Sequence, residues 1–354
     1  MPKVVNKSEN VFDCTVVVVS GGKPRIDLTV QTLKSINNQK LQPKEKIFIN
    51  HGHTENTMQK ISDSKELNSG WKIIGFPINT YDPNDPSSLY KYIGPASLDA
   101  STSDYIFFIA DDDLVGVDFF ERMSKLITNN TDVIVATGLA VELNEEGSIV
   151  YPPKGSWEKR DKYEHGISVY RNIYRPDELY QPNPGHSYII KRRLLLETRD
   201  TIFTFGFPDL TPLFQIIPRG IFAYDKKALM LRKIHNNQIH NEWDRRNTEL
   251  NFYLPHYKKM LELNLGVMKT IQGLHKEDLK LGKRYFQRLA TRSCWLAINN
   301  VVPDIDSNYQ TLKTPFWTKM KYFSHMIKTP MYSFRMIFQP GRIKKFLFRI
   351  DNHV

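Results

Sequence analysis

The sequence predicts an α/β fold in which a mostly parallel sheet is flanked by helices and followed by a helical, basic C-terminal extension. Over about the first 150 residues, short apolar runs alternate with segments of helical period. Strands separated by helices of this length require right-handed crossovers, which place successive strands parallel in one sheet. The composition of the 354 residues, 40% hydrophobic and 25% charged, excludes disordered, collagen-like and coiled-coil classes.

The first three predicted strands are apolar runs that end in turns. Residues 12–19 form the first run, which stops at residues 20–24 (Ser-Gly-Gly-Lys-Pro) and leads into a helical pattern over residues 25–38. Residues 46–49 and 71–75 are the second and third strands. Because ligands of such sheets bind at the carboxyl ends of parallel strands, the polar residues that follow these runs are candidate binding residues.

Further along the chain, a helix over residues 87–100 precedes a fourth strand over residues 105–110. A strand over residues 133–141 and a short strand-helix unit over residues 187–197 follow. From about residue 247 the apolar spacing is helical. We therefore expect three parts: an α/β domain, a helical region packed on it, and a basic amphipathic tail. Their expected bounds are residues 1–245, 246–312 and 313–354.

Cysteine content and hydropathy bear on the compartment. The two cysteines, Cys14 and Cys294, lie far apart, which excludes a disulfide scaffold and a cysteine zinc site and fits a reducing environment. No apolar run reaches the length of a membrane span, and the polar first ten residues lack a signal-peptide pattern. These features predict a cytoplasmic protein.

The positive charge is concentrated in the tail. Residues 313–354 carry nine Lys and Arg residues against one Asp, so they contribute +8 of the net charge of +11. The nearly balanced remainder argues against a nucleic-acid partner. Aromatic and aliphatic residues interleave with the basic ones, a pattern that favours binding to an anionic membrane surface. Helices packed on the catalytic domain with a solvated basic face, or contact with an RNA or protein partner, are the alternatives.

Three adjacent carboxylates, Asp111, Asp112 and Asp113, follow the fourth strand directly. At the end of a buried strand they would repel one another and raise each other's pKa, so a cation is expected beside them. Mg²⁺ and Mn²⁺ prefer carboxylate oxygens and keep positions for water and phosphate. In extended backbone, Asp111 and Asp113 would share one face. The alternative is a solvated acidic turn, or a helix cap preceding residues 114–123.

This layout resembles the GT-A glycosyltransferases, especially family 2, over about residues 12–240. The most specific elements are residues 103–106 (Ser-Asp-Tyr-Ile) and residues 109–114 (Ile-Ala-Asp-Asp-Asp-Leu). The resemblance implies that a metal held by the Asp motif bridges the diphosphate of a nucleotide-sugar and stabilises the leaving group as a Lewis acid. Departures from the family pattern are Ala110 in the first Asp position, residues 20–23 in place of Pro-Thr-Tyr-Asn, Asn50-His51 in place of an acidic pair, and Gly94-Pro95 in place of Arg-Asn.

The resemblance also implies roles for particular residues. Asp209, which follows an aromatic-and-glycine turn, corresponds to the general base that takes the proton of the acceptor hydroxyl; helix capping is its alternative role. The implied metal ligands are Asp111, Asp112, Asp113 and His235, and for His235 a structural role is the alternative. The implied nucleotide-sugar contacts are Ser20, Gly21, Arg25, Asn50, His51, Lys91, Asp111, Asp112, Gly185 and His186.

The expected function is therefore that of a Mn²⁺- or Mg²⁺-dependent, inverting glycosyltransferase. It would move a sugar, from a UDP-sugar by expectation, to a glycan or lipid-linked acceptor in bacterial surface polysaccharide, lipooligosaccharide or capsule synthesis, at the inner face of the plasma membrane. Two alternatives are a nucleotidyltransferase acting on a sugar phosphate and a non-catalytic membrane-docked scaffold. A glycoside hydrolase would need a separated carboxylate pair, which the sequence does not reveal.

Overall fold

The structure is a computed structural model that falls into two compact units. The first comprises residues 1–236 and 266–275, and the second comprises residues 237–265 and 276–354. The residues that the structure describes are 11–21, 25–80, 87–144, 147–151, 161–174, 188–203, 215–233, 262, 265–267, 269–280, 301–303 and 309–311.

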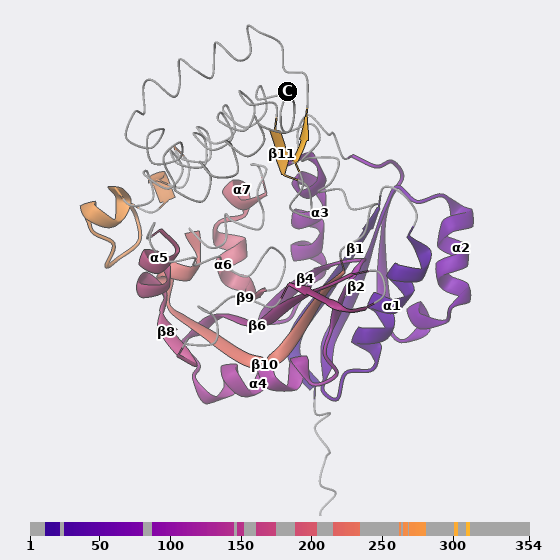
Figure 1. The fold of residues 1–354 in the computed structure, drawn as a ribbon, viewed down its shortest axis with the longest axis horizontal. Helices are drawn as coiled ribbons and strands as arrows, with labels where there is room; N and C mark the ends of the chain where they lie inside the picture. The colour runs from indigo at the N-terminus through magenta and orange to yellow at the C-terminus, as the bar shows by residue number, and fades with distance from the viewer. Residues whose placement is uncertain are drawn as a thin grey trace, which may run out of the picture. The chain divides into compact units, whose positions relative to one another are not determined.

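The first unit is built on one sheet with the strand order β3-β2-β1-β4-β9-β6-β10-β5, to which β7 and β8 add at β6 and β10 (Figure 1). Strands β1 to β4 pair in parallel, as do β6 and β10, while β9 lies antiparallel between β4 and β6. The predicted mostly parallel sheet is therefore confirmed. The strands are β1 Val11–Gly21, β2 Gln42–His51, β3 Trp71–Phe76, β4 Tyr105–Ala110, β5 Asp113–Val115, β6 Val133–Leu143, β7 Ile149–Tyr151, β8 Tyr163–His165, β9 Tyr188–Lys191 and β10 Ile221–Lys233.

Helices cover both faces of this sheet, with α4 on one side and α3, α6 and α7 on the other (Figure 1). In α1, residues Leu33 and Ile36 turn inward at helical spacing, and in α4 the residues Phe119 and Phe120 are fully buried. The helices are α1 Ile26–Asn37, α2 Glu55–Asp63, α3 Ser87–Ala100, α4 Phe119–Asn129, α5 Gly166–Tyr174, α6 Arg192–Glu197 and α7 Arg199–Ile202, with 3-10 turns η1 Glu66–Asn68 and η2 Ile217–Arg219.

The core explains why β1 reads as an unbroken apolar run. Val16, Val17 and Val18 are all fully buried, because helices pack on both faces of this central parallel strand. Alternate residues of β1 and β4 join α1, α2 and α4 in one cluster. On the opposite face, the rings of Phe108 in β4 and Phe203 after α7 pack edge to face with centroids 6.5 Å apart.

The strand register gathers polar residues at the carboxyl edge of the sheet. Val19 pairs with Ala110, Ser20 pairs with Asn50, and Gly21 pairs with His51. The residues that follow β4 therefore lie beside the last residues of β1, and β2 ends next to them. This is the edge at which ligands of open α/β sheets bind.

The structure differs from the sequence patterns in two places. The alternative of a helix cap before residues 114–123 does not hold, because Asp113–Val115 forms β5 and pairs with β10 before α4 begins at Phe119. In the second unit, helix is described at residues 276–280, but Val301–Pro303 and Tyr309–Thr311 form the antiparallel pair β11 and β12 inside the region expected to be helical. The β-branched Val301-Val302 pair favours strand.

The residues described include no helix long and apolar enough to span a bilayer. The predicted tail, residues 313–354, lies outside the described residues.

Candidate active site

Asp111, Asp112 and Asp113 form a buried cluster at the carboxyl edge of the sheet. Their exposed fractions are only 1%, 7% and 8%, which excludes the solvated acidic turn that the sequence left open. They follow β4 directly, and β4 is held between β1 and β9. Three carboxylates removed from water at one point need compensation by positive charge or hydrogen-bond donors.

Arg25, which directly precedes α1, provides part of that compensation. Its two terminal nitrogens lie 2.5 Å from Asp111 Oδ1 and 2.6 Å from Asp112 Oδ2, so one guanidinium bridges two adjacent carboxylates. The sequence favoured Asp111 and Asp113 on one face of extended backbone; in the structure the chain turns at residues 111–112, Asp113 belongs to β5, and Asp111 shares its arginine with Asp112. An arginine fork suits such planar double contacts.

The other oxygen of Asp111 is bound by hydroxyl groups. Ser20 Oγ donates to Asp111 Oδ2 at 2.6 Å, and Thr29 Oγ1 donates to the same oxygen at 3.1 Å. His53 Nε2 lies 2.8 Å from Ser20 Oγ, and since the Ser20 proton is directed to Asp111, His53 Nε2 is the donor in this pair. Asn50 Oδ1 accepts from the backbone N–H of His53 and so fixes this turn.

Asp113 has a different environment. The backbone N–H of Lys233 hydrogen-bonds its carboxylate, and the Arg232 charge acts on it, but Oδ1 is buried without a hydrogen-bond partner. Burial, and next the charge of Asp112, raise the pKa of Asp113 to about 8. Burial also raises the pKa of Asp111, and the Arg25 guanidinium opposes that rise. Without a cation beside it, Asp113 therefore holds its proton at neutral pH.

His51 ends β2 on the same edge. Its Nε2 accepts from the backbone N–H of Thr80 at 3.1 Å, which places the proton of the neutral ring on Nδ1. That Nδ1–H is buried without a partner. Burial, and secondly the neighbouring His53, lower the pKa of His51 to about 4. A Cβ at Gly21 would lie 2.8 Å from the His51 carbonyl oxygen, so this close approach of β1 and β2 requires glycine.

The structure thus brings together five of the predicted donor-site positions around the cluster, namely Ser20, Gly21, Arg25, Asn50 and His51. Lys91 is exposed on α3 with its amine 5.8 Å from the Tyr92 ring, and among the described residues no contact joins it to the cluster. Asp209, Gly185, His186 and His235 lie outside the described residues.

Sequence reasoning did not identify Thr29 and Arg232 as members of the site. Thr29 follows Arg25 by four residues, so both lie on one face of the first turn of α1, and this spacing could have indicated it. Arg232 reaches Asp113 only because β10 pairs with β5 in the register Arg232 to Asp113. No local sequence pattern predicts that β5 pairs with β10.

The cluster fits a divalent cation in its chemistry. Carboxylate oxygens are the ligands that Mg²⁺ and Mn²⁺ prefer, and Asp113 Oδ1 is a buried acceptor without a partner. Nevertheless, within the described ranges no three His, Cys, Asp or Glu side chains converge as a metal-binding group. Arg25 occupies one oxygen each of Asp111 and Asp112 instead.

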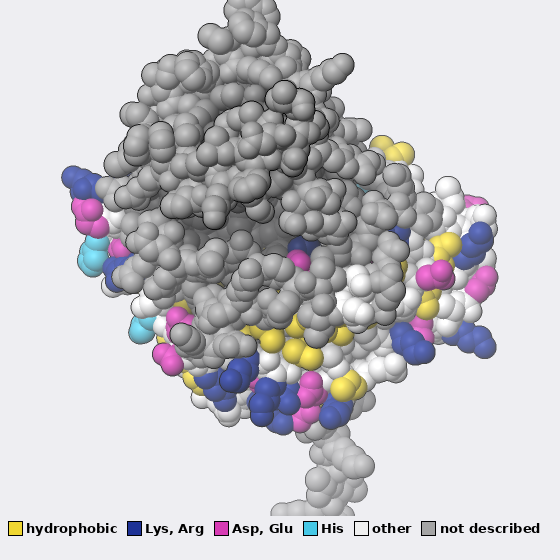
Figure 2. Space-filling model, viewed as in Figure 1, with side chains coloured by type: hydrophobic (Ala, Val, Ile, Leu, Met, Phe, Trp, Pro, Cys, Tyr) yellow, Lys and Arg dark blue, Asp and Glu magenta, His cyan; other side chains and the backbone are white. Residues whose placement is uncertain are grey.

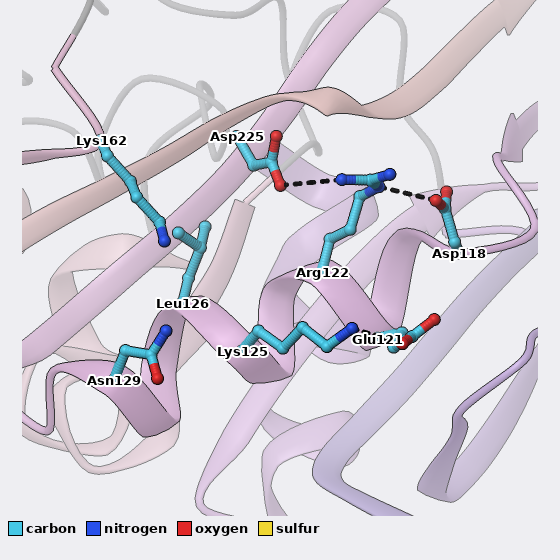
Figure 3. A pocket seen from close by; sticks show the side chains of 8 residues that line it. All are labelled: Asp118, Glu121, Arg122, Lys125, Leu126, Asn129, Lys162 and Asp225. Atoms are coloured by element: carbon cyan, nitrogen blue, oxygen red, sulfur yellow. Dashed lines mark hydrogen bonds and ion pairs between the residues drawn. The ribbon is translucent and has the colours of Figure 1, made fainter.

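A separate cavity of about 280 Å³ lies over α4 and β10 (Figure 3). Arg122 crosses it and pairs with Asp118 at 2.6 Å and with Asp225 at 3.4 Å, so its charges compensate one another. Figure 2 shows the same mixture of both signs along the lower rim of the described surface. The cavity is lined by Asp118, Glu121, Arg122, Lys125, Leu126, Asn129, Lys162 and Asp225.

Comparison with solved structures identifies the fold. The structure of TarS residues 1–349 from S. aureus in complex with UDP is similar with a TM-score of 0.53 and 11% identity, over 78% of this chain and 71% of that one. The mannosyltransferase PcManGT from Pyrobaculum calidifontis, in complex with GDP-Man and Mn²⁺, is similar with a TM-score of 0.51 and 13% identity, over 83% and 78% of the chains. The chain has the GT-A fold. No family model and no curated protein matches its sequence.

The predicted GT-A fold class is thereby confirmed. A further TarS structure, in complex with UDP-GlcNAc, is similar with a TM-score of 0.50 and 12% identity over 82% of this chain and 85% of that one. These three structures were thus solved with a nucleotide-sugar or a nucleoside diphosphate. Identities of this size establish the fold and leave the chemistry to be argued from the site itself.

Proposed function

We propose that this chain is a glycosyltransferase that transfers a sugar from a nucleotide-sugar to an acceptor hydroxyl. The observation that carries the proposal is the buried Asp111–Asp113 cluster, bridged by Arg25, at the carboxyl edge of a GT-A sheet. Neighbours with this fold hold UDP, UDP-GlcNAc or GDP-Man, which supports a nucleotide-sugar as the donor class.

The residues at this edge have distinct tasks in the proposed reaction. Arg25 offers a permanent positive charge to the diphosphate, on which negative charge grows as the sugar leaves. Gly21 leaves room where β1 and β2 approach, and His51 presents a neutral ring whose Nδ1–H needs an acceptor, such as a polar atom of the nucleotide. Ser20 and Asn50 hold Asp111 and the His53 turn in place.

A divalent cation, Mn²⁺ or Mg²⁺, is part of the proposal, supported by the orphan Asp113 oxygen and by the Mn²⁺ of the mannosyltransferase neighbour. When bound by Asp113 and the adjacent carboxylates, it would supply Lewis-acid charge to the diphosphate. Several further parts of the proposal rest on the sequence resemblance. They are Asp209 as the general base with inversion at the sugar, His235 as a further metal ligand, Lys91, Gly185 and His186 as contacts to the nucleotide-sugar, and a UDP-sugar as the donor.

The direct test is a thermal-unfolding screen of nucleoside diphosphates and nucleotide-sugars, each with and without Mn²⁺. A ligand that binds the folded state raises the unfolding temperature, and at 100 times its Kd it stabilises by about 2.7 kcal/mol. We expect one nucleotide class to stabilise the protein, with its nucleotide-sugar releasing nucleoside diphosphate when an acceptor is added. Release of pyrophosphate from a nucleoside triphosphate and a sugar phosphate would instead identify a nucleotidyltransferase.

For the acceptor and the cellular site, the proposal is a glycan or lipid-linked acceptor of bacterial surface polysaccharide at the inner face of the plasma membrane. It rests on the charge of +8 in residues 313–354, interleaved with aromatic residues. Deletion from Lys313 onward should abolish binding to vesicles containing anionic lipid and leave nucleotide binding intact. Vesicle binding that survives this deletion would contradict the assignment, and neutral vesicles are the matched control.

A further inference from the structure

Both carboxylate oxygens of Asp111 already have partners, and one of these partners is the cation Arg25. Asp111 Oδ1 is taken by the guanidinium, and Asp111 Oδ2 accepts from the hydroxyl groups of Ser20 and Thr29. Arg25 also holds one oxygen of Asp112. Its side chain is nine-tenths buried, so this contact is part of the interior and not a surface ion pair.

A guanidinium and a divalent cation held by the same carboxylate oxygens repel each other. Arginine stays charged at any physiological pH, so it cannot make way by losing its proton and has to move. A metal ion would lie about 2.1 Å from each ligand oxygen, closer than the guanidinium nitrogens at 2.5 and 2.6 Å. In a low-dielectric site, each of two cations that share one carboxylate pair weakens the binding of the other.

The same cluster also contains two unpaired atoms of opposite character. Arg25 Nε is a buried donor without an acceptor, and Asp113 Oδ1 is a buried acceptor without a donor. Leaving either atom without a hydrogen-bond partner costs about 1–3 kcal/mol. Without a bound ligand, hydrogen bonding is therefore complete for Asp111 and incomplete for Arg25 and Asp113. A phosphate oxygen is an acceptor suited to Arg25, and a divalent cation is suited to Asp113.

We infer that Arg25 is a built-in counter-cation that withholds Asp111 and Asp112 from metal until a diphosphate group draws it away. Metal and diphosphate then bind cooperatively, because the diphosphate binds the guanidinium while the metal takes over the freed carboxylates. This inference rests on the proposed function for the identity of the anion. It concerns the protein without a bound nucleotide-sugar, however, and can be tested without any transfer reaction.

The experiment measures Mn²⁺ binding to the full chain by electron paramagnetic resonance, with and without inorganic pyrophosphate. In the wild type, Mn²⁺ alone should bind weakly. Pyrophosphate should raise the affinity of the protein for Mn²⁺ by about tenfold, which is within the usual range of coupling between sites. In Arg25→Gln, Mn²⁺ alone should bind about tenfold tighter than in the wild type, and pyrophosphate should change that affinity by less than about threefold. If Mn²⁺ alone binds Arg25→Gln no tighter than wild type, the inference is wrong.

The matched control is Arg122→Gln. Arg122 also bridges two Asp side chains, but over the α4 cavity and away from the cluster, so its removal should leave Mn²⁺ affinity at the wild-type value. An equal gain in both variants would show a general charge effect and overturn the inference. If Arg25→Gln does not fold, as judged by circular dichroism, Arg25→Lys replaces it. A lysine lacks the planar fork that pairs with both carboxylates, so Mn²⁺ should bind about threefold tighter, and unchanged binding would again overturn the inference.

Failure of this inference and failure of the proposed function give different results. If the protein transfers sugar but Arg25→Gln leaves the Mn²⁺ affinity unchanged, the proposed glycosyltransferase function stands and the role of Arg25 as counter-cation is wrong. If Arg25→Gln binds Mn²⁺ more tightly but no nucleotide-sugar supports transfer, the role of Arg25 stands and the proposed function is wrong.

Discussion

Buried carboxylates at the two edges of the central sheet differ in how far hydrogen bonds and charges compensate them. At the amino edge, Glu45 of β2 is half-buried and accepts hydrogen bonds from Thr15, from the backbone and hydroxyl of Thr102, and from those of Ser103. Burial alone would raise the pKa of Glu45, but these donors, led by Thr102, lower it to about 2. This carboxylate ties β1, β2 and the start of β4 together.

At the carboxyl edge, by contrast, the effect of burial on the carboxylate pKa exceeds that of the hydrogen bonds and nearby positive charges. Asp113 keeps an unpaired oxygen and a pKa of about 8, while Asp111 and Asp112 share a single arginine. Since both edges belong to the same strands, the fold is able to satisfy a carboxylate fully and does so at Glu45. The unpaired oxygen of Asp113 is therefore consistent with the proposed binding of a ligand at this edge.

The largest effect expected from this comparison is on catalysis. Replacing Asp111 and Asp113 together by Asn should lower kcat/KM of sugar transfer by more than about 100-fold, because it removes the carboxylates that would hold a divalent cation at the diphosphate. Asp118→Asn, which changes an acid over the α4 cavity, should stay within about threefold of the wild type. Steady-state kinetics measure both, and transfer that survives the double replacement would show that the site lies elsewhere.

The next largest effect is on stability at the amino edge. Glu45→Gln should lower the free energy of unfolding at pH 7 by about 1–3 kcal/mol, because it weakens charge-assisted hydrogen bonds. The folded pKa of about 2 lies below the ordinary 4.5, so this stabilisation is present above pH 4.5 and is lost as pH falls toward 2. Urea unfolding at pH 7 and pH 3 should show a smaller difference at pH 3, with nucleotide binding unaffected. A constant difference would rule out the charge as its cause.

A smaller effect of opposite sign is expected at the carboxyl edge. The folded pKa of Asp113, about 8, lies above its ordinary 3.8, so ionisation penalises the folded state increasingly as pH rises from 3.8 to 8. Asp113→Asn should therefore stabilise the metal-free protein by about 1 kcal/mol at pH 8 and by less at pH 5. Unfolding in the presence of a chelator tests this, and a variant that is destabilised at pH 8 would contradict it.

The smallest effect concerns His51. Its folded pKa of about 4 lies below the ordinary 6.5, so the folded state binds fewer protons than the unfolded chain between these values. The stability contributed by the neutral ring is present above pH 6.5 and is lost as pH falls toward 4. Proton NMR of the ring should give a midpoint near pH 4, and His51→Gln should flatten the pH dependence of stability over this range. A midpoint near 6.5 would show that the ring is solvated.

The sequence by itself determined the elements that depend on local pattern. The helix Ser87–Ala100 and the strand Tyr105–Ala110 have the predicted bounds, because helical period and unbroken apolar runs are properties of neighbouring residues. The position of three Asp residues directly after a buried strand was readable for the same reason, and the GT-A resemblance followed from it. Strand lengths were underestimated where polar residues such as Gln42 to Glu45 continue β2.

Only the tertiary structure decided what each carboxylate contacts. Arg25 precedes Asp111 by 86 residues, and Arg232 follows Asp113 by more than 100, so both contacts arise from strand pairing that no local pattern encodes. The sequence could not show that Asp112 faces Arg25 together with Asp111, nor that one Asp113 oxygen stays unpaired. Hydrogen-bond satisfaction depends on where the side chains of distant segments lie, and folding alone sets those positions.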